Sequence, residues 1–227
     1  MCWSFEASAV FAAIGFAAAG YLAYKKKEKS LWIIVGYFAI MELLQALAYF
    51  NLNNCGSPFN QIITYLSYLH IVFQPFFVNA FMMYFIPKET KKRISGWVYA
   101  LCFIVAISML VKVYPFAWAG TCDSAGSLCG AQMCSMSGSW HLIWALPLNS
   151  MPLVSAAHFF VMFILPIIYG SWKAAVYSFL LGPALAWLLS SSMHEVAAIW
   201  CLFSIAIIFA VLFTPLENFL KVRKWYF

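Results

Sequence analysis

Ionisable side chains are rare in the apolar stretches of this chain, so each one is a candidate for chemistry. Only 9% of the residues are charged, and an ionisable group placed in lipid is energetically expensive and usually functional. The candidates are Glu6, Glu42, His70, His158, His194 and Glu195. Two neutral imidazoles with one or two carboxylates form a ligand set that suits zinc, iron or copper.

The candidates converge on one layer of the predicted bundle. At a rise of 1.5 Å per residue, Glu42 lies about 12 Å, His70 about 13 Å and His158 about 9 Å from the outer ends of their helices. Glu6 is shallower, and His194 lies at the outer mouth of the last helix. We therefore predict a metal or cofactor site formed by His70, His158 and Glu42, with Glu6 and His194 assisting.

Amide side chains share helix faces with these candidates. Gln45 follows Glu42 by three residues, and Gln74 follows His70 by four, so each pair lies on one face. We expect Gln45, Gln74 and Glu195 to orient the metal ligands through hydrogen bonds.

Other uses of the same layer stay open. The imidazoles could ligate haem or a chlorophyll-type pigment, and a Glu and His series could relay protons in a proton-coupled carrier. A hydrogen-bonded network that only fixes the bundle is a further alternative. So is an accessory subunit, or a pigment- or lipid-binding subunit, of a larger respiratory or photosynthetic membrane complex, with other membrane subunits as partners. No catalytic residue is assigned, and the sequence leaves open whether the protein is an enzyme.

The elements that must position these residues are predicted to be transmembrane helices. The chain has 227 residues, of which 65% are hydrophobic, and its mean hydropathy is +0.88. We predict a single domain over residues 1–227, an all-α bundle of seven transmembrane helices. Each segment is close to the ~20 residues that span a bilayer. The seven segments are Trp3–Tyr24, Leu31–Phe50, Gln61–Ile86, Gly96–Tyr114, Pro152–Tyr169, Trp172–Leu189 and Val196–Phe213.

Basic residues set the predicted orientation. Clusters at residues 25–29, 88–93 and 221–224, together with Lys173, all fall on the same side of the seven segments. Only Lys112 does not, and near the end of the fourth segment its long side chain can reach the interface. The positive-inside rule then places the N-terminus outside and the C-terminus in the cytoplasm. The net charge of +6 therefore reports topology in a plasma, inner or organellar membrane, and we expect lipid rather than nucleic acid as the surrounding partner.

Cysteines gather on the predicted outer side, in an oxidising compartment. The long outer loop at residues 115–151 and its neighbours contain Cys2, Cys55, Cys122, Cys129 and Cys134. One or two disulfides are predicted among them. Cys129, Cys134 and Met136 with His141 are an alternative Cu(I) ligand set. An aromatic stretch at residues 140–148 is expected to lie along the outer interface as a lid or short helix.

Small residues and prolines predict the packing of the helices. Ala9, Ala13, Ala17 and Gly20 form a stripe on the first helix that would allow a close helix contact. Pro166 and the Gly182-Pro183 pair predict bends or local unwinding in the fifth and sixth helices.

Some functions are excluded by missing residues. The last helix has no lysine for a retinal Schiff base, and the chain has no glycine-rich phosphate loop for a nucleotide. In helix number and histidine use the chain resembles the membrane zinc hydrolases that include alkaline ceramidases and adiponectin receptors. Those carry a His-x-x-x-His motif, whereas here Ala198 follows His194 by four residues.

A closer resemblance comes from three short strings. These are the opening Met-Cys-Trp-Ser, the run from His70 to Pro75 and the Ser139-Trp-His141 triplet. In these strings the chain resembles an uncharacterised family of small multi-spanning membrane proteins, a domain of unknown function. The resemblance spans most of the chain and implies no activity.

Overall fold

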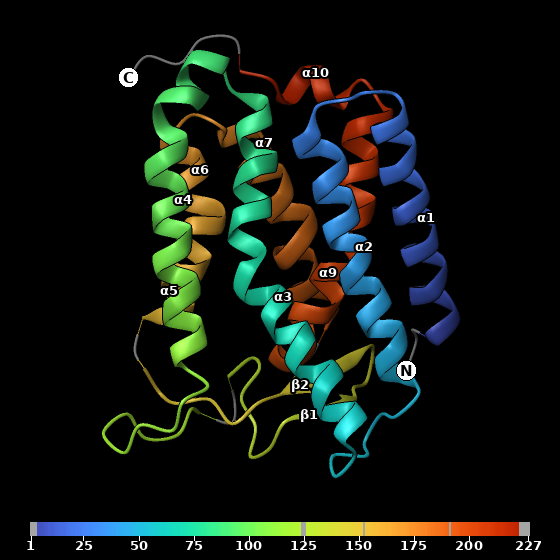
Figure 1. Ribbon diagram of the computed structural model, residues 1–227, viewed down its shortest axis with the longest axis vertical. Coiled ribbons are helices and arrows are strands. Elements are labelled where there is room, and N and C mark those ends of the chain that lie inside the picture. Colours follow the sequence, from blue (N-terminus) through green and yellow to red (C-terminus); the bar gives the residue numbers. More distant parts are fainter. Residues whose placement is uncertain (1–3, 124–125, 152, 191, 223–227) are drawn as a thin grey trace.

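The computed structural model describes residues 4–123, 126–151, 153–190 and 192–222. They form an elongated bundle of helices with a small β-hairpin at one end (Figure 1). Cys2, one of the predicted disulfide cysteines, lies outside the described residues.

Six helices in the described part of the chain are long and apolar enough to cross a bilayer. They match six of the predicted segments. They are α1 (Phe5–Tyr24), α2 (Lys29–Tyr49), α3 (Pro58–Met82) with the 3₁₀ turn η1 (Met83–Phe85), α4 (Lys88–Val111), α7 (Trp172–Phe179) continued by η3 (Leu180–Ala184) and α8 (Leu185–Leu189), and α9 (Met193–Phe213).

The fifth predicted segment is helical but shorter. It consists of α5 (Val154–Phe159), η2 (Phe160–Ile164) and α6 (Leu165–Ile168), and at 1.5 Å per residue it extends about 22 Å. This helix runs along the bundle beside α4 (Figure 1). A short helix, α10 (Leu216–Leu220), follows α9 at the end of the bundle opposite the hairpin.

The predicted distortions at the prolines are confirmed. Both η2 and η3 are π-helical segments inside otherwise α-helical runs; η2 ends two residues before Pro166, and η3 contains Pro183. A proline lacks the backbone N–H that an α-helix needs, so a locally widened turn is a common way to accommodate it. Pro75, in contrast, lies within α3 without ending the helix.

α1 packs on α2 through a different face from the one predicted. Ala13, Ala17 and Gly20 of the predicted stripe are exposed, and the buried face carries Ser8 and Gly15. A Cβ at position 15 would lie 2.7 Å from the Cβ of Ala39, so glycine is required for this close approach. Small residues lie on several faces of α1, so the sequence alone could not show which of these faces packs against α2.

The loop after α4 folds into a hairpin, which corrects the all-α prediction. Strands β1 (Cys134–Ser137) and β2 (Leu142–Ala145) pair antiparallel, and Cys134 lies opposite Ala145. The stretch expected as a short helix or lid forms β2 because Leu142 and Trp144 point into the apolar core at this end of the bundle. Alternate apolar and aromatic residues suit a strand packed on one face.

Two disulfides hold this region, as predicted. Cys55–Cys134 ties the α2–α3 loop to β1, and Cys122–Cys129 closes a short loop. Both cysteines of the alternative Cu(I) set are therefore in disulfides. Cys102 and Cys201 are free and buried within helices.

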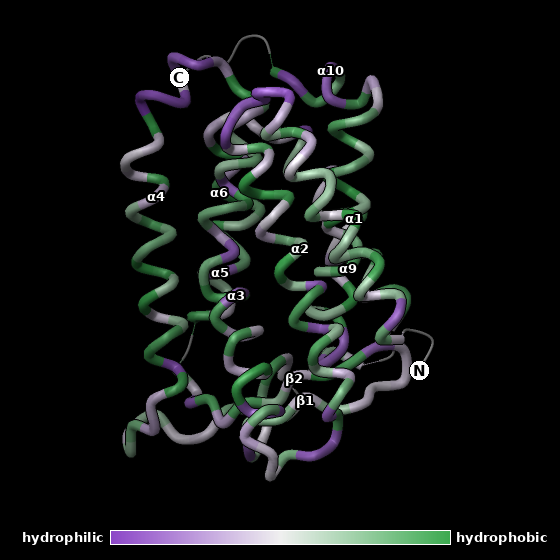
Figure 2. Tube along the Cα trace, turned by 45° about the vertical axis from the view of Figure 1, so that its right-hand side comes forward, coloured by the Kyte–Doolittle hydropathy of each residue, from purple (hydrophilic) through white to green (hydrophobic). Residues whose placement is uncertain are grey.

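The two ends of the bundle differ in character. The hairpin end carries β1, β2 and the disulfides, and the opposite end, which we call the lysine end, carries the basic clusters at residues 25–29 and 88–93 and α10. Hydrophobic residues follow the middle of the helices, and hydrophilic ones gather at the lysine end (Figure 2).

A buried polar site between α2, α3 and α9

A carboxylate at the start of α9 holds the loop between β1 and β2. Ser192 caps α9 by accepting the His194 N–H, and Glu195 follows in the first turn. The backbone N–H groups of Ser139, Trp140 and His141 donate to the Glu195 carboxylate at 2.5, 3.0 and 3.2 Å. Three consecutive N–H donors around one carboxylate form a strong, charge-assisted anchor.

The close approach of this loop depends on Gly138. A Cβ at this position would lie 2.5 Å from the Glu195 Oε1 atom and even closer to the His141 carbonyl oxygen. Any larger residue would therefore push the loop away from α9.

The anchored loop inserts His141 into the bundle. Its Nε2 lies 2.7 Å from the Gln45 Oε1, and its Nδ1 lies 3.0 Å from the Tyr49 hydroxyl. The Gln45 amide nitrogen donates to the Ala198 carbonyl at 3.4 Å, so its oxygen faces the histidine. This arrangement assigns the proton to Nε2 and leaves Nδ1 to accept from Tyr49. The side chain is 1% exposed, and burial lowers the pKa of His141 to about 3.

Glu42 lies one helical turn from Gln45 and is fully buried. Its exposed fraction is 0%, and Ser8 of α1 lies beside the carboxyl. Neither oxygen makes a well-formed hydrogen bond to a described residue. The carboxyl lies near enough to Tyr49 and to Cys201 to interact with both electrostatically. An isolated carboxylate in such a place costs several kcal/mol or more, so the group must hold a proton or receive a cation.

His70 clasps α2 through a reciprocal contact with Tyr37. The His70 Nε2 donates to the Tyr37 carbonyl at 2.7 Å, the Tyr37 hydroxyl donates to the His70 carbonyl, and the two rings stack at 3.8 Å. The His70 Nδ1 has no partner among the described residues. One turn further along α3, both amide atoms of the buried Gln74 are also without a partner there.

A small cavity extends this face of α3 toward the lysine end. Its volume is about 30 Å³, and Val78, Ser178 and Ser204 are among its lining residues. Val78 follows Gln74 by one turn. A volume of this size accommodates about one water molecule.

His158 has a structural partner on the other flank of α3. Pro75 lacks the N–H that would bond the Ile71 carbonyl four residues earlier, and the His158 Nε2 donates to that carbonyl at 3.0 Å. A matching contact lies nearby, in which a side chain of α3 bonds a carbonyl of η2. Pro166 cannot donate to the Val161 carbonyl of η2, and Asn79 donates to it at 2.9 Å.

Of the predicted ligands, Glu42, His70 and His158 face the interior of the bundle, but they do not meet at one metal position. His70 faces α2, whereas His158 reaches α3 from α5. Glu6 is exposed on α1, and His194 lines a groove beside the hairpin. Among the described residues, no group of three or more His, Cys, Asp or Glu could hold a metal ion. The predicted amide partners Gln45 and Gln74 do lie in the interior, as does Glu195.

Sequence reasoning missed His141 and Tyr49 as members of the interior site. His141 belongs to a long polar loop, and nothing in its spacing indicates that the loop folds back into the helices. The only signal was the neighbouring run of apolar and aromatic residues.

The fold and the site define a class: a bundle with six helices, among the described residues, that are long and apolar enough to cross a membrane, whose interior holds acidic, imidazole and amide groups. The chain belongs to a family of unknown function, DUF5765, whose model matches residues 6–221. No curated protein and no solved structure matches the chain.

Proposed function

We propose that the protein is an integral membrane protein that crosses the bilayer seven times, with the α5–η2–α6 helix as the fifth crossing. Two features support this topology: α1 starts at the hairpin end, and α10 lies at the opposite end (Figure 1). The basic clusters mark the lysine end as cytoplasmic. The disulfides suit an outer, oxidising compartment at the hairpin end.

Within this topology, we propose that the protein relays protons between the two sides of the membrane, with Glu42 as the group that binds and releases them. The observation that carries the proposal is the complete burial of a carboxyl that lacks a well-formed hydrogen bond. Intramembrane carboxyl and histidine series are the usual components of proton pathways.

The residues around Glu42 would form two proton routes, one toward the hairpin end and one toward the lysine end. Toward the hairpin end lies Tyr49, whose hydroxyl is hydrogen-bonded to His141 and which lies near Glu42. Toward the lysine end, Cys201 is within electrostatic range of both Glu42 and Tyr37, the partner of His70. Gln74 and the small cavity follow. The unpartnered atoms of His70 and Gln74 are suited to bind water along this route.

In one cycle, a proton that enters from the hairpin end forms an O–H bond on the Glu42 carboxyl. Breaking that bond toward the lysine end passes the proton to water on that route and restores the carboxylate, whose burial without a partner favours uptake of the next proton. The π-helical segments η2 and η3 offer places where the helices can adjust during this exchange. Metal binding at His70 or His158 stays a prediction that the geometry does not favour, because the two side chains reach different helices and no group of three or more possible ligands gathers among the described residues. Pigment binding at these imidazoles stays a prediction.

The test is proton flux into proteoliposomes that contain a pH-sensitive dye, with valinomycin and potassium to set the driving voltage. We expect flux with the natural chain and a loss of at least tenfold with Glu42→Gln. Glu6→Gln is the matched control, since it removes an exposed carboxyl from the same end of the bundle. No flux above empty liposomes, or equal flux with Glu42→Gln, would refute the relay.

A further inference from the structure

A large cavity opens at the lysine end, remote from the polar site. Its volume is about 940 Å³, and it lies between the start of α2, the η1–α4 junction and the segment after α10. Val222 donates its N–H to the Phe85 carbonyl at 2.8 Å, which fixes that last segment against η1. Three lysines, Lys88, Lys91 and Lys221, line the cavity.

The charges around the cavity favour an anion. Lys91 pairs with Glu28 at 2.6 Å, and Lys221 pairs with Glu217 at 2.5 Å. Lys88 has no ion-pair partner within the described part of the chain. Lys27 is within electrostatic range of Glu217. Among the lining residues, three lysines stand against one carboxylate, Glu28, an excess of two positive charges that a phosphate monoester could neutralise.

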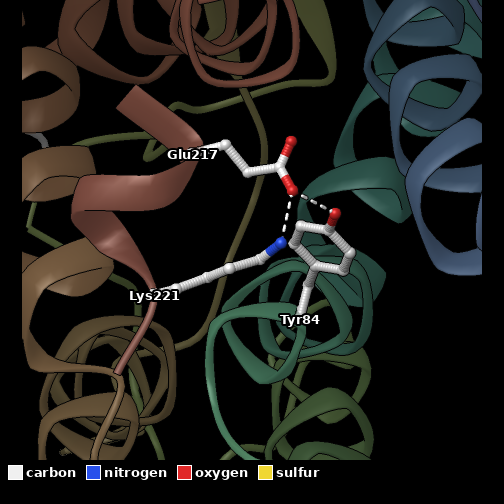
Figure 3. Close-up of polar contacts among 3 residues, drawn as sticks. All are labelled: Tyr84, Glu217 and Lys221. Atoms are coloured by element: carbon white, nitrogen blue, oxygen red, sulfur yellow. Dashed lines mark hydrogen bonds and ion pairs between the residues drawn. The ribbon is translucent and has the colours of Figure 1, made fainter. Parts of the chain in front are cut away.

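The existing ion pairs are weak enough to be exchanged. The side chains of Lys91 and Glu28 are 31% and 42% exposed, and exposed pairs of this kind contribute only about 0–1 kcal/mol. Glu217 holds two donors at once, because the Tyr84 hydroxyl donates to the same oxygen at 2.6 Å (Figure 3). A phosphate oxygen could take over the Lys221 contact while Tyr84 retains Glu217.

The residues that line the cavity favour an anionic lipid over a free anion. The apolar lining consists of Met83, Phe85 and Ile86, which are at most 7% exposed, and of the half-buried Tyr84 and Pro87, while Lys88 is exposed. α4 also begins here at Lys88, so its N-terminal dipole adds positive potential. An acyl chain along the apolar lining and a phosphate at the lysines would use both features.

We propose that this cavity binds the phosphate headgroup of an anionic lipid in the leaflet at the lysine end. The inference rests on the membrane placement proposed above but not on proton relay. It revises the view that the basic residues serve only topology, since three of them share a cavity with an apolar wall.

Native mass spectrometry of the full chain in detergent tests the site with phosphatidic acid, phosphatidylcholine and inorganic phosphate as probes. We expect one phosphatidic acid per chain, bound at least tenfold more tightly than phosphatidylcholine. The double variant Lys88→Gln, Lys91→Gln should weaken this binding at least tenfold. Lys92→Gln, the matched control, removes an exposed neighbouring charge that does not line the cavity and should change nothing.

A second variant tests the competition within the site. Glu217→Gln should tighten phosphatidic acid binding, because Lys221 then loses its resident carboxylate. Equal binding by the double variant and the natural chain would overturn the proposal. If inorganic phosphate binds the same lysines as tightly as phosphatidic acid, the lipid assignment is overturned in favour of a soluble anion. Proton flux is not part of these measurements, so failure here leaves the relay intact.

Discussion

Acid should loosen the hairpin loop, because His141 is buried in its neutral form. Burial lowers the pKa of this imidazole to about 3, whereas an exposed histidine titrates near 6.5. When the loop opens, His141 meets water and binds a proton that the closed state excludes. The stabilisation is therefore complete above pH 6.5 and is lost progressively as the pH falls from 6.5 toward 3.

The size of the effect follows from the two pKa values. Each pH unit within this window costs about 1.4 kcal/mol of opening free energy. Between neutral pH and pH 5 the loss is about 2 kcal/mol, which corresponds to roughly a thirtyfold increase in the open population. This figure depends only on the free-energy difference between the open and the closed hairpin loop. The free energy of unfolding of the whole bundle does not affect it.

Hydrogen exchange of the Ser139, Trp140 and His141 amides measures this opening, because Glu195 protects all three in the closed state. After correction for the intrinsic pH dependence of exchange, their protection should fall about thirtyfold from pH 7 to pH 5.

The variant His141→Gln should abolish the slope, and His194→Gln should retain it. Corrected protection that is independent of pH in the natural chain would refute the buried, neutral assignment of His141.

Two further substitutions test the packing contacts. His158→Ala should destabilise the bundle by about 1–3 kcal/mol, because it leaves the Ile71 carbonyl unpaired. Adding Pro75→Ala should recover part of the loss, because it restores a backbone donor to that carbonyl. Thermal unfolding of the single and double variants measures this coupling, and no coupling would contradict the contact. Gly138→Ala should lower the unfolding temperature and the protection of the hairpin loop, because no space exists for its Cβ, whereas Gly96→Ala, which has open space, should be neutral or slightly stabilising.

The helical segments could be predicted because hydrophobic length is a local property. Trp172–Leu189 was predicted with the bounds that the structure has, and the distortions near Pro166 and Pro183 follow from a missing backbone donor. α9 begins at Met193, three residues before the prediction. That difference places Glu195 inside the first turn, where it can receive the loop.

The contacts between helices could not be predicted, because they depend on how each helix is rotated about its axis and on which helices pack against each other. Shared helix faces and the cost of polar groups in lipid indicated that Glu42, Gln45 and Gln74 are interior residues, and all three are buried. Depth alone could not show that His70 turns to α2 while His158 bonds a carbonyl freed by a proline. A histidine with a backbone partner and one that awaits a ligand look the same in sequence.

Infrared difference spectroscopy observes most directly the proton that we propose Glu42 exchanges inside the bundle. Spectra of the full chain in nanodiscs, recorded as the buffer is switched between acid and alkaline pH, isolate the carbonyl bands of carboxyl groups that gain or lose protons. We predict a pH-dependent band that disappears in Glu42→Gln and remains in Glu6→Gln. Difference spectra that Glu42→Gln leaves unchanged would show that this carboxyl keeps one protonation state and would contradict its role in a relay.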